Sequence, residues 1–393
     1  MNRKFLWAAP VVVALLLSAC GSSTSGTASS AAPEAAASSA PAPSVAASAA
    51  ASESAPDAVS VAADYIASVS SPVEMVAAVG PDFTPKPGMT IGVMSCGQIA
   101  TPCKRMADAA VEAVEAMGYK AIMTDGQLSP PGYTKAIMEL VDKKVDLIIA
   151  SVAAAATVPE AYKAAAAAGI PLVCLNCSNA ALPSDLKAAA NADADAIAQG
   201  NQMANYAISS SNGDVKAIVY TSTPTTSIKT RSDQAIKVLT ECATCTVLDV
   251  KEIPLVPEQQ QLIRDEVTSL LQKYGPGELN WIVGGADFPI VGALEAIKAA
   301  GRDDVKVVSV GCDPQNLEII GAGGAQVQCS DDPLEWMGWA SADLAGRILA
   351  GQTVTDVMLP SEFVTATVNF PPAGQTPVLP DFRATYKAQW GIS

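Results

Sequence analysis

Histidine is absent from the 393 residues, and aromatic residues make up only 5% of them. Without histidine, the chain lacks the base of Ser-His-Asp and Cys-His catalysis and the commonest zinc ligand. Basic residues are also scarce, because 24 lysines and arginines stand against 39 acidic residues and give a net charge of −15. Such a chain is poorly suited to nucleic acid. We therefore expect no enzyme activity, no metal, no cofactor and no nucleic-acid partner.

Long apolar runs are missing as well. The longest, residues 5–17, is shorter than the roughly 20 residues that span a bilayer, and it follows the charged Arg3 and Lys4. This pattern predicts a signal peptide over residues 1–19. The run ends in Leu-Ser-Ala-Cys-Gly, which resembles a bacterial lipobox and implies a lipid on Cys20 after cleavage. The alternative is an ordinary secretory cleavage site with a chance cysteine.

The segment after the lipobox lacks large apolar side chains. Residues 20–56 are nearly all Ala, Ser, Pro, Gly and Thr. Too little apolar surface is present to offset the entropy of ordering the chain, so we expect a disordered tether. Residues 57–88 have the pattern of a short helical lead-in, and the remaining residues suffice for two lobes.

From residue 89 on, apolar runs of strand length alternate with helical patterns. Examples are MTIGVMS (residues 89–95), VDLIIA (145–150) and PLVCL (171–175). Strands that are apolar throughout and separated by helices predict βαβ units and a parallel sheet covered on both faces. A second series of similar length follows residue 191. The expected fold class is α/β, with two similar doubly wound parallel-sheet lobes.

Eight cysteines remain if Cys20 carries a lipid. An even number in an exported chain indicates disulfides, and neighbours in sequence are the simplest pairing. The competing interpretation joins the two C-x-x-C motifs into a zinc or iron–sulfur site. The expected pairs are Cys96–Cys103, Cys174–Cys177, Cys242–Cys245 and Cys312–Cys329.

Several segments occur in an order that is informative as a set. They are IGVMS at 91–95, DGQLSPPGYTKAIMELVDKKVDLIIAS at 125–151, AAAAAGIPLVCLN at 164–176, Asp287-Phe288 before GALEAIKAAGR, VVSVGCD at 307–313 and Asp332-Pro333 before Gly338. Together they resemble type I periplasmic binding proteins of the ribose- and galactose-binding kind, which are related to the ligand-binding domain of LacI-type repressors. The resemblance covers about residues 89–362.

The resemblance implies three crossovers between the lobes, near Asn191, Cys329 and Pro360. The lobes would then comprise residues 89–191 plus 330–361 and residues 192–329 plus 362–393. It also implies a monomer that closes by hinge motion around one small-molecule solute and delivers it to an ABC permease in the membrane. The protein would act outside the cytoplasm, anchored by lipid to the bacterial cell membrane.

In open parallel sheets, ligands bind beyond the carboxyl ends of the strands. We therefore expect the solute, a sugar by resemblance, to contact side chains that follow strands. The candidates are Ser95, Gln98, Asp125, Ser151, Asn176, Ser178, Lys229, Arg231, Asp287, Phe288, Asp313, Gln328 and Asp331.

Some of these candidates have plain structural alternatives. Asp313 is the first choice, because it ends the VVSVG strand where the family places a sugar-contacting acid, but Asp is also a preferred helix N-cap. Arg231 has the alternative of a solvated helix residue, and Asp125 that of a turn former. Asn176-Cys177-Ser178 replaces the family's Asp-Arg pair, which leaves the identity of the solute open.

Three other functions remain as alternatives. Cys174-Leu-Asn-Cys177 has the spacing of a redox motif, although a loop sequence follows it and not a helix. The protein could instead be a ligand-binding sensor that reports to a membrane receptor. Within the binding interpretation, the solute could be a polyol, a furanone or a small aromatic compound.

Overall fold

The computed structural model describes residues 57–76, 80–177, 186 and 188–392. The expected signal peptide, the lipid site Cys20 and the tether lie outside these residues, as does the candidate Ser178. In the part of the chain that is described, no helix combines the length and the apolarity that a bilayer crossing requires.

The first lobe is built on a six-stranded parallel sheet in the order β11-β5-β4-β3-β1-β2. The central strands β1, β3 and β4 are mostly apolar and buried. Every residue of β3 is buried, as expected where helices cover both faces of a sheet. The strands are β1 (Thr90–Ser95), β2 (Lys120–Asp125), β3 (Leu147–Ser151), β4 (Leu172–Leu175), β5 (Ala190–Ala194) and β11 (Val357–Leu359).

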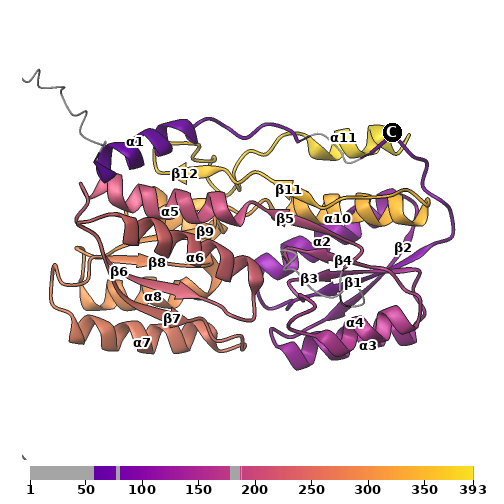
Figure 1. The fold of residues 1–393 in the computed structure, drawn as a ribbon, viewed down its shortest axis with the longest axis horizontal. Coiled ribbons are helices and arrows are strands. Elements are labelled where there is room, and N and C mark those ends of the chain that lie inside the picture. Colours follow the sequence, from indigo (N-terminus) through magenta and orange to yellow (C-terminus); the bar gives the residue numbers. More distant parts are fainter. Residues whose placement is uncertain (1–56, 77–79, 178–185, 187, 393) are drawn as a thin grey trace, which may run out of the picture. The chain divides into compact units, whose positions relative to one another are not determined.

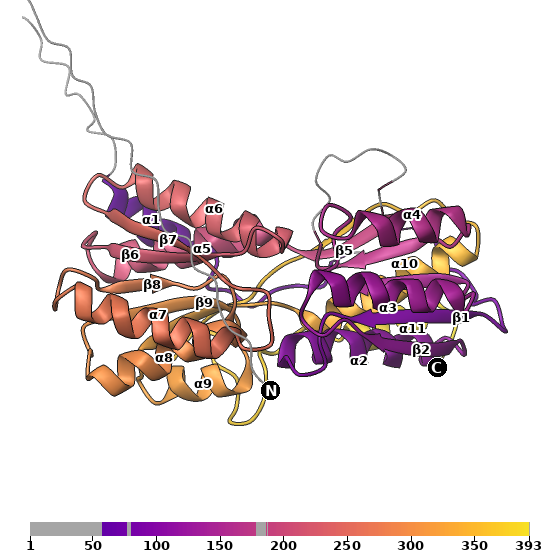
Figure 2. The same ribbon diagram turned by 90° about the horizontal axis from the view of Figure 1, so that it is seen from below.

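Helices α2 (Thr101–Ala116) and α10 (Leu334–Leu349) pack side by side on one face of this sheet (Figure 1). Helices α3 (Pro130–Asp142) and α4 (Pro159–Ala167) contact each other beside β2 and β3 (Figure 2). Helix α3 begins where it does because Ser129 accepts a hydrogen bond from the Gly132 amide and Pro130 occupies the first turn.

The second lobe is also built on a six-stranded sheet, with the strand order β12-β10-β9-β8-β6-β7. Only β12 runs antiparallel to its neighbour among these strands. The strands are β6 (Lys216–Thr221), β7 (Thr246–Glu252), β8 (Trp281–Val283), β9 (Lys306–Gly311), β10 (Gln326–Asp331) and β12 (Phe363–Thr365).

The helices of the second lobe also form two layers. The pair α5 and α6 covers one face, and the pair α7 and α8 lies together on the other side (Figure 2). Helix α1 packs on α5, and α9 packs beside β10. The bounds are α1 (Ala58–Ser68), α5 (Ala196–Ser210), α6 (Thr226–Glu241), α7 (Gln259–Lys273), α8 (Asp287–Ala300) and α9 (Pro314–Gly321).

Three crossovers connect the two sheets, between β5 and α5, between β10 and α10, and between β11 and β12. The two later crossovers are joined by Gln199 of α5. Its Nε2 donates to Ser361 Oγ (2.8 Å), Asp332 Oδ1 (3.2 Å) and the Asp331 carbonyl (3.3 Å). One buried amide therefore holds two connecting segments together. The fold class and the three crossovers expected from the sequence are confirmed.

The last residues differ from expectation. We assigned residues 362–393 to the second lobe, but only β12 joins the second sheet. Helix α11 (Phe382–Gln389) packs on α10 of the first lobe, where Trp390 stacks on Trp339 with ring centroids 5.4 Å apart. The physical reason is apolar burial, because Phe382, Tyr386 and Trp390 lie on one side of the segment and are all buried against the first core.

Candidate functional site

The loops that follow the strands of both sheets meet at one cavity. The first lobe contributes residues after β1, β2, β3 and β4, and the second contributes residues after β6, β7 and β8. The crossover after β10 adds Asp332. The cavity has a volume of about 90 Å³. Its position is the one expected for ligands of open parallel sheets.

Most of the lining is apolar. The Cys96–Cys103 disulfide forms part of the wall, and Phe288 is the aromatic ring that the second lobe contributes to it. The other apolar lining residues are Ala100, Pro102, Met106, Leu128, Val152, Ile228, Ile253, Leu255, Ala286, Pro289 and Leu334.

The polar part of the cavity is centred on the carboxylate of Asp332. Asn176 Nδ2 of the first lobe donates to Asp332 Oδ2 over 3.4 Å, and Arg231 Nη1 and Nη2 of the second lobe donate to the same oxygen, each over 3.4 Å. Gln199 holds the other carboxylate oxygen. Donors from both lobes thus converge on one acid, and a hydroxyl placed here could accept from Arg231 and donate to Asp332.

Two basic side chains in the first half of helix α6 differ in their surroundings. Arg231 is buried, and its Nε donates to the Ser227 carbonyl over 3.2 Å, which turns the guanidinium toward the cavity. Lys229 is exposed and pairs with Asp233 over 2.6 Å on the outer side of the helix. Of the candidates from the sequence, the cavity lining contains Asn176, Arg231 and Phe288. Lys229 lies away from it.

The remaining first-lobe candidates serve the loops themselves. Asp125 Oδ1 accepts from the amides of Gln98 (3.2 Å) and Gln127 (3.0 Å), which is the turn-forming role of an aspartate. Ser95 Oγ donates to the Cys103 carbonyl over 3.3 Å. Ser151 is buried at the end of β3. None of Ser95, Gln98, Asp125 and Ser151 lines the cavity.

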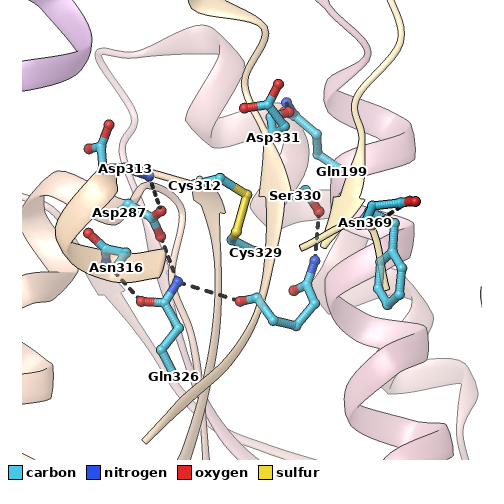
Figure 3. The surroundings of a disulfide bond; sticks show 12 residues. Gln199, Asp287, Cys312, Asp313, Asn316, Gln326, Cys329, Ser330, Asp331 and Asn369 are labelled. Atoms are coloured by element: carbon cyan, nitrogen blue, oxygen red, sulfur yellow. Dashed lines mark hydrogen bonds between the residues drawn. A yellow bond between two sulfur atoms is a disulfide. The ribbon is translucent and has the colours of Figure 1, made fainter. Parts of the chain in front are cut away.

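The second-lobe acids Asp287, Asp313 and Asp331 lie around the Cys312–Cys329 disulfide (Figure 3). Asp287 accepts from the Asp313 amide (3.1 Å) and from Gln326 Nε2 (2.9 Å). Burial, with a contribution from the Asp313 carboxylate, raises the pKa of Asp287 to about 7. Burial also raises the pKa of Asp331 well above its ordinary value. Gln328 bonds Ser330 Oγ over 3.0 Å. These four candidates are absent from the cavity lining.

Asp313 is instead part of an ion pair between the lobes. Its Oδ1 accepts from Arg105 Nη1 of α2 over 3.2 Å, and Arg105 also binds Glu335 of α10 through Nε (2.7 Å) and Nη2 (2.9 Å). Burial alone would lower the pKa of Arg105, but the carboxylates of Glu335, Asp331 and Asp313 together raise that pKa above its ordinary value. Although Asp313 stands at the N-cap position of α9, its side chain does not cap that helix.

The eight cysteines form the four expected pairs. Cys96–Cys103 ties the loop after β1 to α2, and Cys312–Cys329 ties the end of β9 to β10 with a Cα–Cα distance of 5.4 Å. Within the described residues, no group of acidic or cysteine side chains is arranged to hold a metal ion.

Sequence reasoning missed Asp332 and the extent of the apolar wall. Asp332 stands directly after β10 at an expected crossover, so its place between the lobes could have been predicted from the sequence. We chose Asp331, one residue earlier, and the alternation of a strand places these two side chains differently. The apolar wall was missed because polar strand-end residues were taken to face the solute.

Comparison with known families gives one match that covers most of the chain. Residues 91–353 match the model of the periplasmic binding protein domain. No curated protein matches the sequence.

Solved structures with the same fold include solute-binding proteins of ABC transporters. One from Agrobacterium vitis with bound allitol is 21% identical, with a TM-score of 0.64 over 71% of this chain and 96% of that one. One from Bacillus halodurans with bound myo-inositol is 20% identical, with a TM-score of 0.62 over 71% and 95%. One from Mycobacterium smegmatis with bound glycerol is 18% identical, with a TM-score of 0.66 over 75% and 100%.

Proposed function

We propose that this chain, which belongs to the periplasmic binding protein family, binds a small hydroxylated solute in the cavity between its two lobes and delivers it to an ABC permease. The observation that carries the proposal is the convergence of Asn176 and Arg231, from different lobes, on Asp332. A solute at this point would contact both lobes at once, and closure would therefore be favoured by binding.

The sugar and polyol class is supported by two arguments. The Arg231–Asp332 pair offers a donor and an acceptor side by side, which suits a hydroxyl. Three of the solved structures with the same fold were determined with the polyols allitol, myo-inositol and glycerol. The role is binding and not catalysis, and the three crossovers would serve as the hinge.

The lipid anchor on Cys20 belongs to the same proposal. The lipobox-like sequence ends at this cysteine, and the low-complexity segment that follows would let the folded part reach a permease. Metabolic labelling with a radioactive fatty acid should mark the wild-type chain and leave Cys20→Ser unlabelled. Labelling of the variant would refute the anchor and leave the binding role standing.

The binding role is tested by two substitutions on one helix. Arg231→Gln should weaken binding of the cognate sugar or polyol by about 10- to 100-fold, because a hydrogen bond to a charged group is worth about 1.5–3 kcal/mol. Lys229→Gln is the matched control, since Lys229 is exposed two residues earlier on α6, and its affinity should stay within about twofold. Isothermal titration calorimetry measures both. Equal losses in the two variants would contradict the assignment of the cavity.

A further inference from the structure

Two side chains that line the cavity from the first lobe have buried polar atoms without a partner. Tyr133 is 1% exposed and Asn176 is 5% exposed. Neither the Tyr133 hydroxyl nor Asn176 Oδ1 has a hydrogen-bond partner among the described residues. A buried polar group that lacks a partner costs free energy, and native structures leave few such groups unsatisfied. A molecule bound in the cavity would supply the missing partners.

Two other buried tyrosines of the first lobe have backbone partners. The Tyr162 hydroxyl donates to the Ala153 carbonyl over 3.0 Å, and the Tyr119 hydroxyl accepts from the Lys86 amide over 3.1 Å. Neither of these tyrosines lines the cavity. Tyr133 does line it, and its hydroxyl is left unpaired by the protein.

The loop between β2 and α3 fixes the Tyr133 ring in place. The Gly126 amide of this loop donates to the Ser95 carbonyl over 2.8 Å, and the Tyr133 amide donates to the Ser129 carbonyl over 2.9 Å. A Cβ atom at Gly126 would lie 2.4 Å from Tyr133 Cδ1, so the ring packs where only a glycine leaves room for it. Because the ring is held before a solute arrives, its hydroxyl can bind at little cost in conformational entropy.

The two unpaired atoms have different hydrogen-bonding roles. Burial, with a contribution from the Asp125 carboxylate, raises the pKa of Tyr133, so its hydroxyl stays protonated and can donate. Asn176 Nδ2 donates to the Asp332 carboxylate, which fixes the orientation of the amide and leaves Oδ1 as an acceptor. A solute hydroxyl can accept from the first group or donate to the second, whereas a CH₂ group can satisfy neither.

From these contacts we infer that Tyr133 binds the solute: its hydroxyl donates to a solute oxygen, while Asn176 Oδ1 accepts from a solute hydroxyl. The inference rests on the proposed solute-binding function and adds to it a specificity-determining residue. Tyr133 lies on α3 beside β2, Asn176 follows β4, and β1 and β3 lie between these strands in the sheet. The first lobe therefore approaches the solute from two separate elements, and it selects against solutes that lack an oxygen at Tyr133.

Tyr133→Phe removes the hydroxyl and keeps the ring. Isothermal titration calorimetry on the full chain without its signal peptide uses myo-inositol, D-ribose and D-galactose as probes. For the probe that the wild type binds most tightly, the affinity of the variant should fall about fivefold or more, because a buried solute oxygen loses its donor. The melting temperature without solute should not fall. Unchanged affinity would overturn the inference and leave the proposed function standing, and if no probe binds the wild type, both fail.

Tyr162→Phe is the matched control, because the Tyr162 hydroxyl is also buried in the first lobe but bonds a carbonyl outside the cavity lining. It should lower the melting temperature and leave the affinity within about twofold. If Tyr133→Phe behaves in the same way, its hydroxyl has a structural partner such as a buried water, and the inference is wrong.

Monodeoxy analogues of the same probe separate direct contact from an indirect effect. The analogue that lacks the oxygen at Tyr133 should bind the wild type about fivefold or more weakly than the parent probe, whereas Tyr133→Phe should bind the two within about twofold. Analogues that lack an oxygen elsewhere should lose the same affinity in both proteins. If both proteins discriminate against every analogue to the same extent, the Tyr133 hydroxyl does not contact the solute, and the inference fails even where the variant binds more weakly.

Discussion

Three aspartates that follow strands of the second lobe have different roles. Asp332 receives donors from both lobes, Asp313 pairs with Arg105, and Asp287 is buried among amide groups. Burial and the partner of each carboxyl decide its role, and a sequence position after a strand does not specify either.

The raised pKa of Asp287 gives a pH-dependent stability. Between its ordinary pKa of 3.8 and the folded value of about 7, the folded state holds a proton that the unfolded state has lost. The contribution of this residue to stability is therefore complete below about pH 4 and falls by about 1.4 kcal/mol per pH unit until about pH 7.

Asp287→Asn removes this titration while keeping an acceptor for the Asp313 amide. Urea denaturation at pH 5 and pH 8 should show a smaller loss of unfolding free energy in the variant than in the wild type. Parallel pH dependences in the two proteins would show that Asp287 does not titrate in this range. Asp265→Asn is the control, because Asp265 is exposed on α7.

At the scale of side chains, the sequence predicts location better than orientation. Most of the described candidates stand near strand ends, and Asn176, Arg231 and Phe288 line the cavity. Asp125 accepts hydrogen bonds from the backbone amides of Gln98 and Gln127, because the turn-forming role of an aspartate competes with facing a solute. That competition depends on the loop's path, which one sequence does not reveal.

Among the elements, long strongly patterned ones were predictable and short ones were not. The apolar strands β1, β3 and β4 and their helices carry clear patterns. By contrast β5 reads Ala-Asn-Ala-Asp-Ala and lacks large apolar side chains, and β11 (Val-Met-Leu) is apolar but too short to show a strand pattern. Their pairing comes from the neighbouring strand and not from their own propensity.

The contact of α11 with α10 yields a prediction at this scale. Trp390 is fully buried, stacks on Trp339 and donates to Asp343 Oδ1 over 2.8 Å. Trp390→Ala should lower the unfolding free energy by about 3–5 kcal/mol, because a buried aromatic is lost and the Asp343 carboxylate loses a donor. Met358→Ala, at a side chain that is 61% exposed, should change it by less than about 0.5 kcal/mol. Chemical denaturation measures both changes in unfolding free energy. Similar changes in the two variants would contradict the packing of Trp390 against α10.

The disulfides differ in what they support. Cys96–Cys103 lines the cavity, whereas Cys242–Cys245 joins the end of α6 to the start of β7 away from it. Replacing the first pair by serines should reduce solute affinity roughly 5- to 10-fold, because the loop after β1 must then be ordered on binding. The same change in the second pair should leave affinity within about twofold. Titration calorimetry measures the affinity of both variants. If replacing the first pair changes the affinity no more than replacing the second, the first bridge does not order the cavity.

For the molecule as a whole, the ion pair between the lobes is the most testable contact. Arg105 of the first lobe compensates Asp313 of the second as well as Glu335. Arg105→Gln leaves two carboxylates facing each other, so the ligand-free protein should populate arrangements with the lobes further apart. Small-angle X-ray scattering should show a larger radius of gyration than in the wild type.

Arg264→Gln is the matched control for that experiment. Arg264 pairs with Glu295 on the surface of the second lobe, so its loss should leave the scattering unchanged. An unchanged radius in Arg105→Gln would show that the pair does not hold the lobes together.

The central claim is that a small solute binds between the lobes at Arg231 and Asp332. A thermal-shift screen of residues 21–393 against sugars, polyols and cyclic diols tests it most directly. A solute at a hundredfold excess over its dissociation constant stabilises the folded state by about 2.7 kcal/mol. We predict that at least one solute of these classes raises the melting temperature, and that at the same solute concentration the rise falls to about half or less in Arg231→Gln and persists in Lys229→Gln. An undiminished rise in Arg231→Gln, or no rise with any solute, would contradict the claim.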